Sequence, residues 1–164
     1  MQRYLSVHAD MADRGIRPSC RILDARVVTR TAQLTRAGAA SLGARAVRIF
    51  GLRLGDGHPV MVFEHYYPQD MCAFLLDVPR DDPNISLYDL VVRQHGIALT
   101  HATGEIAAVI VSDEEADLLE LAYGSPAIEI RTHTYNDQGR VVEVARAVVR
   151  SDRYALILDS DWSP

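Results

Sequence analysis

The sequence predicts an α+β domain in which helices pack against a central antiparallel β-sheet. Extended apolar runs dominate the chain, and Gly-containing turns typical of hairpins join most neighbouring runs. The order of helix, Gly, strand, turn and strand occurs twice, around residues 43–67 and 124–150. Because strands joined by hairpins are antiparallel, the helices are expected to lie against such a sheet.

The composition is typical of a soluble globular domain. Of the 164 residues, 48% are hydrophobic and 24% are charged, which is enough for one domain with a real core. No apolar run approaches the ~20 residues of a membrane helix, and the first residues lack the apolar core of a signal peptide. We therefore expect a cytoplasmic protein. Cys20 and Cys72 fit free thiols in a reducing compartment, while a disulfide between them stays open.

Several classes of function lack the features that they need. The net charge is −5 and the arginines are scattered, whereas a chain that grips nucleic acid needs a basic face. There is no Gly-x-x-x-x-Gly-Lys phosphate loop and no Gly-x-Ser-x-Gly nucleophile elbow. No two histidines have the i, i+4 spacing of a zinc-binding helix. We expect no cofactor and no metal.

The first third of the chain is predicted to lead into the sheet. Residues 1–14 are expected to form a polar lead-in, which ends in a turn at Gly15 and Pro18. Residues 19–30 predict a strand. The Ala-rich residues 31–43 predict a short helix that ends at Gly43.

A first hairpin is predicted from two extended runs, residues 46–54 and 59–67, which Gly55, Asp56 and Gly57 join. With a two-residue loop, Val47, Ile49, Gly51 and Arg53 would share a face with Val60, Val62 and Glu64. The facing pairs of that register are Arg53 with Val60 and Gly51 with Val62.

Two capped helices and a second hairpin are predicted further along. Ser86 is a favourable N-cap for one helix, and Ser112 forms a capping box with Glu115 for the other. Gly96 ends the first helix and Gly124 the second. The expected strands are residues 97–111, residues 128–135, the strand that carries Glu143, and residues 154–159.

Glu143 is the most informative residue of the second hairpin. On its predicted strand it shares a face with Val141, Ala145, Ala147 and Val149. An unpaired buried charge is costly, so this acid needs a partner. A structural salt bridge and a ligand-binding acid on a pocket floor are both open.

The segment 48–68 resembles the first hairpin of the UTRA domain, the effector-sensing half of HutC-type regulators in the GntR family. Further matches follow in the order and spacing of that family, so that the resemblance covers nearly the whole chain from about Gly15 onward. They are Gly15-x-x-Pro18, Ser86-Leu-Tyr88-Asp-Leu90, Leu118-Leu-x-x-x-x-Gly124-x-Pro126, Glu143 and Arg150-Ser-Asp152-Arg153-Tyr154.

The resemblance implies a chorismate lyase-like fold, with a small-molecule cleft in residues 15–164. Family members carry a winged helix-turn-helix domain ahead of this one, and residues 1–14 would be the linker from that missing domain. Effector binding in such regulators reorients the DNA-binding heads of a homodimer. The expected partners are therefore a small-molecule effector and a second copy, with DNA contacted only through the missing domain and no membrane.

The resemblance assigns five effector-binding residues and no catalytic ones. Arg53 offers a fork of donors for a carboxylate or phosphate, and Glu64 and Glu143 accept from hydroxyl or amine groups. Ser86 and Tyr88 open the helix whose N-terminus faces the cleft. Simpler roles are also open: a helix cap for Ser86, a core ring for Tyr88, and an ion pair between Arg53 and one of the glutamates.

Three departures from the family pattern point to a weakly charged or neutral effector. Gly51 and Thr132 stand where many relatives have arginines, and Val149 replaces a frequent tyrosine. The alternative functions are a chorismate lyase-like enzyme, in which Arg53 and a glutamate would bind a dicarboxylate, and a pure dimerisation module with an empty cleft.

Overall fold

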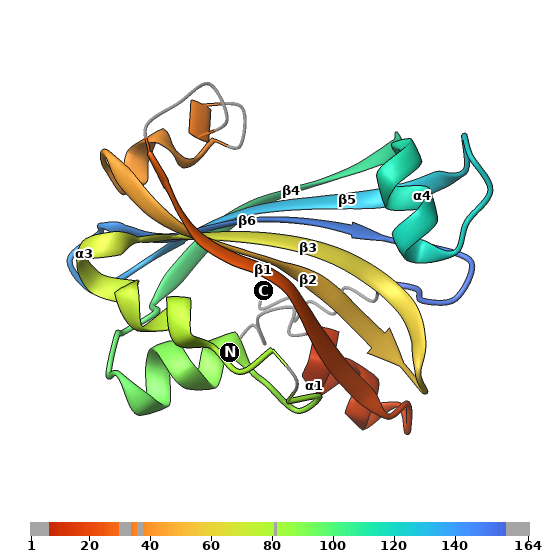
Figure 1. Ribbon diagram of the computed structural model, residues 1–164, viewed down its shortest axis with the longest axis horizontal. Coiled ribbons are helices and arrows are strands. Elements are labelled where there is room, and N and C mark those ends of the chain that lie inside the picture. Colours follow the sequence, from red (N-terminus) through yellow and green to blue (C-terminus); the bar gives the residue numbers. More distant parts are fainter. Residues whose placement is uncertain (1–6, 30–33, 36–37, 81, 157–164) are drawn as a thin grey trace, which may run out of the picture.

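A six-stranded antiparallel sheet with the order β1-β2-β3-β6-β5-β4 organises the computed structural model, which describes residues 7–29, 34–35, 38–80 and 82–156 (Figure 1). This confirms the predicted fold class. The strands are β1 Pro18–Thr29, β2 Arg45–Gly55, β3 His58–Pro68, β4 His101–Ile110, β5 Pro126–Tyr135 and β6 Val141–Val149.

Short helices precede β1 and occupy the connections β1–β2, β3–β4 and β4–β5. None of those in the described ranges has the length and apolar character needed to cross a membrane. They are α1 Val7–Asp13, the 3₁₀ helices η1 Ala39–Leu42 and η2 Ala73–Asp77, α3 Gln69–Cys72, the π-helix η3 Asp89–Gln94 and α4 Asp113–Leu119.

The two faces of the sheet are covered differently. We call the face under α1, α3, η2 and η3 the inner face; it carries the largest apolar cluster, with Met11, Leu75 and Val91 fully buried against the strands. We call the other face the outer face. There α4 and η1 cover two smaller apolar clusters, one around Leu119 and one around Leu42.

The first hairpin has the predicted strands but a different register. Arg53 faces Met61 and Gly51 faces Phe63, because the register shifts between Arg53 and Leu54. Pairing jumps from Pro59 to Met61 along β3, so Val60 is an extra residue. The expected facing pairs, and the shared face of Arg53 and Glu64, are therefore wrong. A one-residue slip turns every following side chain to the other face, which places Glu64 on the outer face.

Other predicted elements are confirmed or corrected locally. The capping box forms as expected, since Ser112 Oγ accepts from the Glu115 amide at 3.2 Å and Glu115 Oε2 accepts from the Ser112 amide at 2.9 Å. The second hairpin is also confirmed. Within the expected polar lead-in, α1 is a helix that buries Met11 in the core. Residues 154–156 of the expected last strand are not a strand, and its remainder lies outside the described residues.

Two expected helices are shorter or differently wound than predicted. Of the helix expected over residues 31–43, η1 forms just before Gly43, while residues 31–33 and 36–37 lie outside the described residues. The helix that follows Ser86 is wound as a π-helix and ends before Gly96. Both glycines have positive φ, 107° and 67°, which matches their predicted place at helix ends.

Gly51 is held in a position that has no room for a side chain. A Cβ at Gly51 would lie 2.5 Å from the Arg21 carbonyl oxygen and 2.7 Å from Cζ of Phe63. Phe63, brought to the inner face by the β3 bulge, therefore fills the space beside Gly51. This explains in physical terms why an arginine cannot occupy this position in the present packing.

We expect Gly51→Ala to lower the free energy of unfolding by about 1–3 kcal/mol, because the added methyl group displaces a backbone oxygen and an aromatic ring. Urea unfolding of both proteins measures the difference. Phe63→Leu removes the ring atom nearest to the methyl group, so the double variant should lose less stability than the two single variants together. An unchanged unfolding midpoint for Gly51→Ala would contradict this packing.

Candidate functional site

Glu143 lies at the centre of a hydrogen-bonded cluster on the inner face. Its Oε1 bonds His65 Nδ1 at 2.8 Å and accepts the Tyr67 hydroxyl at 2.5 Å, and its Oε2 accepts the Thr134 hydroxyl at 3.1 Å. Three strands supply these groups: β3, β5 and β6. The side chain of Glu143 is only 16% exposed. We call Glu143, His65, Tyr67 and Thr134 the inner cluster.

The electrostatics of the inner cluster favour a charged Glu143. Burial raises the pKa of Glu143, but the electrostatic attraction to His65 and the hydrogen bonds from His65, Tyr67 and Thr134 outweigh it, so the pKa lies below its ordinary value. Burial and the neighbouring Glu143 charge raise the pKa of Tyr67 well above its usual range. Tyr67 is therefore a neutral donor to a carboxylate anion.

Arg53 lies on the same inner face, on β2. Its guanidinium is 5.6 Å from the centre of the Phe63 ring, and its register partner on β1 is Cys20. Burial lowers the pKa of Arg53, opposed by the groups of Cys20 and Tyr67. The Phe63 ring also contacts the His65 ring, with ring centres 5.2 Å apart, and His65 bonds Glu143. Arg53 and Glu143 are therefore linked along the inner face through Phe63 and His65.

The segment that carries Ser86 and Tyr88 packs against the same end of the sheet. The Cys20 amide donates to the Pro83 carbonyl at 2.8 Å, which fixes this segment beside β1. Ser86 Oγ accepts from the Asp89 amide at 3.2 Å, so it caps the helical turn. Tyr88 is 55% exposed and is therefore not a core ring.

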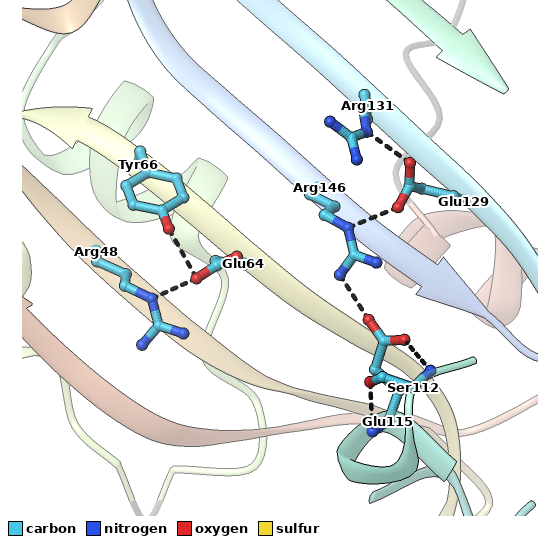
Figure 2. Close-up of polar contacts among 8 residues, drawn as sticks. All are labelled: Arg48, Glu64, Tyr66, Ser112, Glu115, Glu129, Arg131 and Arg146. Atoms are coloured by element: carbon cyan, nitrogen blue, oxygen red, sulfur yellow. Dashed lines mark hydrogen bonds and ion pairs between the residues drawn. The ribbon is translucent and has the colours of Figure 1, made fainter. Parts of the chain in front are cut away.

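Glu64 lies on the outer face in a second group of ionic contacts (Figure 2). It accepts from Arg48 Nε and, at 2.8 Å, from the Tyr66 hydroxyl. Arg48 also donates to Asp24 at 2.9 Å. Burial is the largest cause that raises the pKa of Tyr66, to about 12, and the bond to Glu64 adds to it.

Arg146 is the register partner of Glu64 and anchors a neighbouring group of ionic contacts (Figure 2). It donates to Glu115 and to Glu129, each at 2.6 Å, and Arg131 donates to Glu129 at 2.5 Å. Burial raises the pKa values of Glu115 and Glu129, but hydrogen bonds outweigh it, so both pKa values are lowered. The bonds come from Ser112 and Arg146 for Glu115, and from Arg131 and Arg146 for Glu129.

A hollow of about 190 Å³ lies between the outer face and α4. Its lining combines three apolar side chains with six polar or charged ones, so it is more polar than a typical small-molecule pocket. Its lining residues are Arg48, Phe50, Val62, Glu64, Ser112, Glu114, Glu115, Leu118 and Arg146.

The predicted site residues are thus divided between the two faces. Arg53, Ser86 and Glu143 belong to the inner face, with Tyr88 exposed next to Ser86, and Glu64 belongs to the outer face. Sequence reasoning missed three inner-face partners and four outer-face ones. These are His65, Tyr67 and Thr134, and Arg48, Glu115, Glu129 and Arg146.

The strand pattern held a signal for the missed inner-face residues. Phe63, His65 and Tyr67 alternate along β3, so the correct register would have placed all three on the face of Arg53. The pattern gave no such signal for Arg48 and Arg146, because strand alternation does not show which helix covers each face of the sheet. Across the described ranges, no three His, Cys, Asp or Glu side chains gather in a way that could hold a metal ion.

Comparison with known proteins identifies the class. The family model of the UTRA domain matches residues 13–155, and the chain belongs to this family. It is an effector-binding domain of the kind that GntR-family transcriptional regulators carry.

Individual relatives support this placement. The chain is 26% identical over 157 residues to the HTH-type transcriptional repressor NagR of Bacillus subtilis, a match that covers 96% of this chain and 63% of NagR. A transcriptional regulator structure from Streptomyces coelicolor is 31% identical, with a TM-score of 0.70 and coverage of 85% and 91%. PhnF from Mycobacterium smegmatis shares the fold at 20% identity, with a TM-score of 0.82 over 97% of this chain and 70% of PhnF.

We expect Glu143→Gln to lower the free energy of unfolding at pH 7 by about 1–3 kcal/mol, since the amide weakens the bonds from His65 and Tyr67. The folded-state pKa of Glu143 is below the ordinary 4.5, so the contribution is complete above that pH. It declines as the pH falls through the folded-state pKa. Urea unfolding at a series of pH values measures the difference.

The matched control is Glu105→Gln, which changes an exposed glutamate on β4 and should leave stability unchanged at every pH. A stability gap between wild type and Glu143→Gln that stays constant into acid would show that the charge of Glu143 does not contribute.

Proposed function

We propose that this chain is the sensor domain of a HutC-type regulator that acts in the cytoplasm. A small metabolite would bind the domain and change how an N-terminal winged helix-turn-helix domain, joined through residues 1–14, engages DNA. The family match and the repressor name of the Bacillus subtilis relative support this function. Paired operator half-sites call for a symmetric homodimer.

The effector site that we propose lies on the inner face, with Arg53, Ser86, Tyr88 and Glu143 as its ligand-binding residues. The supporting observation is that two opposite charges, Arg53 and Glu143, lie half-buried on one face and are linked by contacts through Phe63 and His65. Buried charges cost stability, and perturbed titratable groups that gather in one place are typical of functional sites.

The effector that suits this site is weakly charged or neutral. The Phe63 ring fills the space beside Gly51, and Thr132 and the buried Val149 add no positive charge on this face. Arg53 by itself can neutralise one negatively charged group of the effector. Glu143 and His65 can bond a hydroxyl or amine group of the same molecule.

Glu64 belongs to a second candidate place for the effector, the outer hollow beside α4. Its volume is small for a metabolite, and the charged residues that line it already bond one another. The inner face is therefore the site that we favour, and Glu64 is the effector-binding residue of the alternative.

A chorismate lyase-like enzyme is the alternative function. Glu143 accepts three hydrogen bonds and its pKa is lowered, which makes it a poor proton acceptor at neutral pH. These features favour a binding role without catalysis. Loss of chorismate with formation of 4-hydroxybenzoate in the presence of the protein would overturn the sensor proposal.

We expect at least one small metabolite to raise the melting temperature in a screen of amino acids, sugars, sugar phosphates, phosphonates and imidazole acids. At 100 times Kd, a ligand that binds only the folded state adds about 2.7 kcal/mol of stability. Weakly charged and neutral compounds should give the larger shifts. A broad set with no shift would favour a pure dimerisation module.

We expect Glu143→Gln to weaken binding of the identified effector by roughly 1–3 kcal/mol, because a charged hydrogen-bond acceptor is lost from the site. Titration calorimetry measures the affinity. The matched variant Glu64→Gln changes an acid on the opposite face and should leave the affinity unchanged. The reverse result would move the effector to the outer hollow beside α4.

A further inference from the structure

The helix α1 is too short to be stable by itself. It has seven residues, whereas isolated helices shorter than about 12–15 residues are marginal in water. Its docking on the sheet therefore decides whether it is folded. Met11 is fully buried, and its sulfur lies 3.8 Å from where a Cβ of Gly55 would be. The helix thus packs on the turn end of the first hairpin, beside the arrowhead of β2 in Figure 1.

Polar contacts join α1 to residues 154–155. The Tyr154 hydroxyl donates to Asp10, and Arg14, the residue after the helix, donates from Nη1 to the Ala155 carbonyl at 2.9 Å. Arg14 also forms an ion pair with Asp10 at 2.6 Å, and its guanidinium lies 4.9 Å from the centre of the Tyr154 ring. We call Asp10, Arg14 and Tyr154 the clasp.

Arg150 connects the clasp to the sheet. Its amide donates to the carbonyl of Val60, the extra residue of β3, at 3.0 Å, and its Nη1 donates to the Leu119 carbonyl at the end of α4 at 2.6 Å. Its Nε and Nη2 donate to Asp152 at 2.9 and 2.7 Å, and its carbonyl accepts from the Tyr154 amide at 3.3 Å. The buried Arg150 therefore fixes the turn that positions Tyr154.

This junction lies at one end of the strands that carry most of the inner cluster. The cluster takes two residues from β3 and one from β6. Because Met61 pairs with Val149, the contact of Val60 with Arg150 continues the pairing of β3 with β6 by one step. A shift of one strand against the other would therefore move Arg150 and the turn that carries Tyr154.

We propose that the clasp makes α1 a separately releasable helix, which is docked while the Arg150 junction holds Tyr154 in place and unfolded when the clasp opens. The proposal rests on the proposed function, in which residues 1–14 join this domain to a DNA-binding domain. Docked, the seven residues of α1 span about 10 Å; unfolded, they span up to about 23 Å. The preceding domain would be held close to the sheet in the first state and loosely tethered in the second.

Hydrogen exchange in increasing urea tests the release. The amides of Arg14, Gly15 and Ile16 donate to carbonyls of α1, so their exchange reports the opening of this helix. In the wild type they should exchange faster than the amides of β3 and β6. Their exchange should also depend little on urea, because α1 exposes little surface when it opens alone.

Tyr154→Phe keeps the buried ring and removes the hydroxyl that bonds Asp10. Hydrogen bonds to a charged acceptor contribute more than neutral ones, so exchange of the three amides should become roughly 10–100-fold faster. The matched control is Tyr123→Phe, which also loses a tyrosine–aspartate bond, at 2.9 Å to Asp117, but at an exposed position after α4. It should leave exchange of the α1 amides at the wild-type rate.

A second pair of variants tests the Arg150 junction. Asp152→Asn weakens the hold on Arg150 without changing a residue of the clasp, and exchange of the α1 amides should become roughly twofold to fivefold faster. Asp137→Asn makes the same charge change at an exposed position of the turn between β5 and β6 and should have no effect.

Three results would overturn the proposal. They are wild-type α1 amides that share the exchange rate and urea dependence of the strands, Tyr154→Phe without faster exchange, and Asp152→Asn without effect. A compound of the metabolite screen that raises the melting temperature of such a protein would leave the effector proposal standing. A releasable α1 in a protein that no compound stabilises would leave the clasp standing, so the two proposals fail separately.

Discussion

The extra residue at Val60 in β3 governs where the polar groups of this domain lie. Beyond the bulge, Phe63, His65 and Tyr67 point to the inner face, and Glu64 and Tyr66 point to the outer face. Side chains alternate strictly along a strand, so this single irregularity assigns five consecutive residues at once. The inner cluster around Glu143 and the ion pair of Glu64 with Arg48 both follow from it.

The two faces of the sheet compensate the desolvation of their charged groups in different ways. On the inner face, one carboxylate is stabilised by neutral hydroxyl donors and a histidine beneath short, irregular helices. On the outer face, arginines and acids pair with one another at the border of two small apolar clusters. A ligand can add contacts more easily to the first arrangement, since the second already satisfies charge with opposite charge.

The strands that build the inner cluster lie close to one edge of the sheet. β5 pairs with β4 on one side and with β6, which carries Glu143, on the other. The inner cluster therefore spans β3, β6 and β5 and ends one strand short of the sheet edge at β4.

The sequence by itself determined six strands, the hairpins, the capping box of α4 and the family, because alternation, turn residues and caps act between near neighbours. It also singled out Glu143 and Arg53, which the tertiary structure brings to one face. Only the tertiary structure decided the side of Glu64, the partners His65, Tyr67 and Thr134, and the helical entry at α1. The position of a bulge, and which helix covers each face of the sheet, depend on packing between residues far apart in the chain. Local sequence patterns therefore do not predict them.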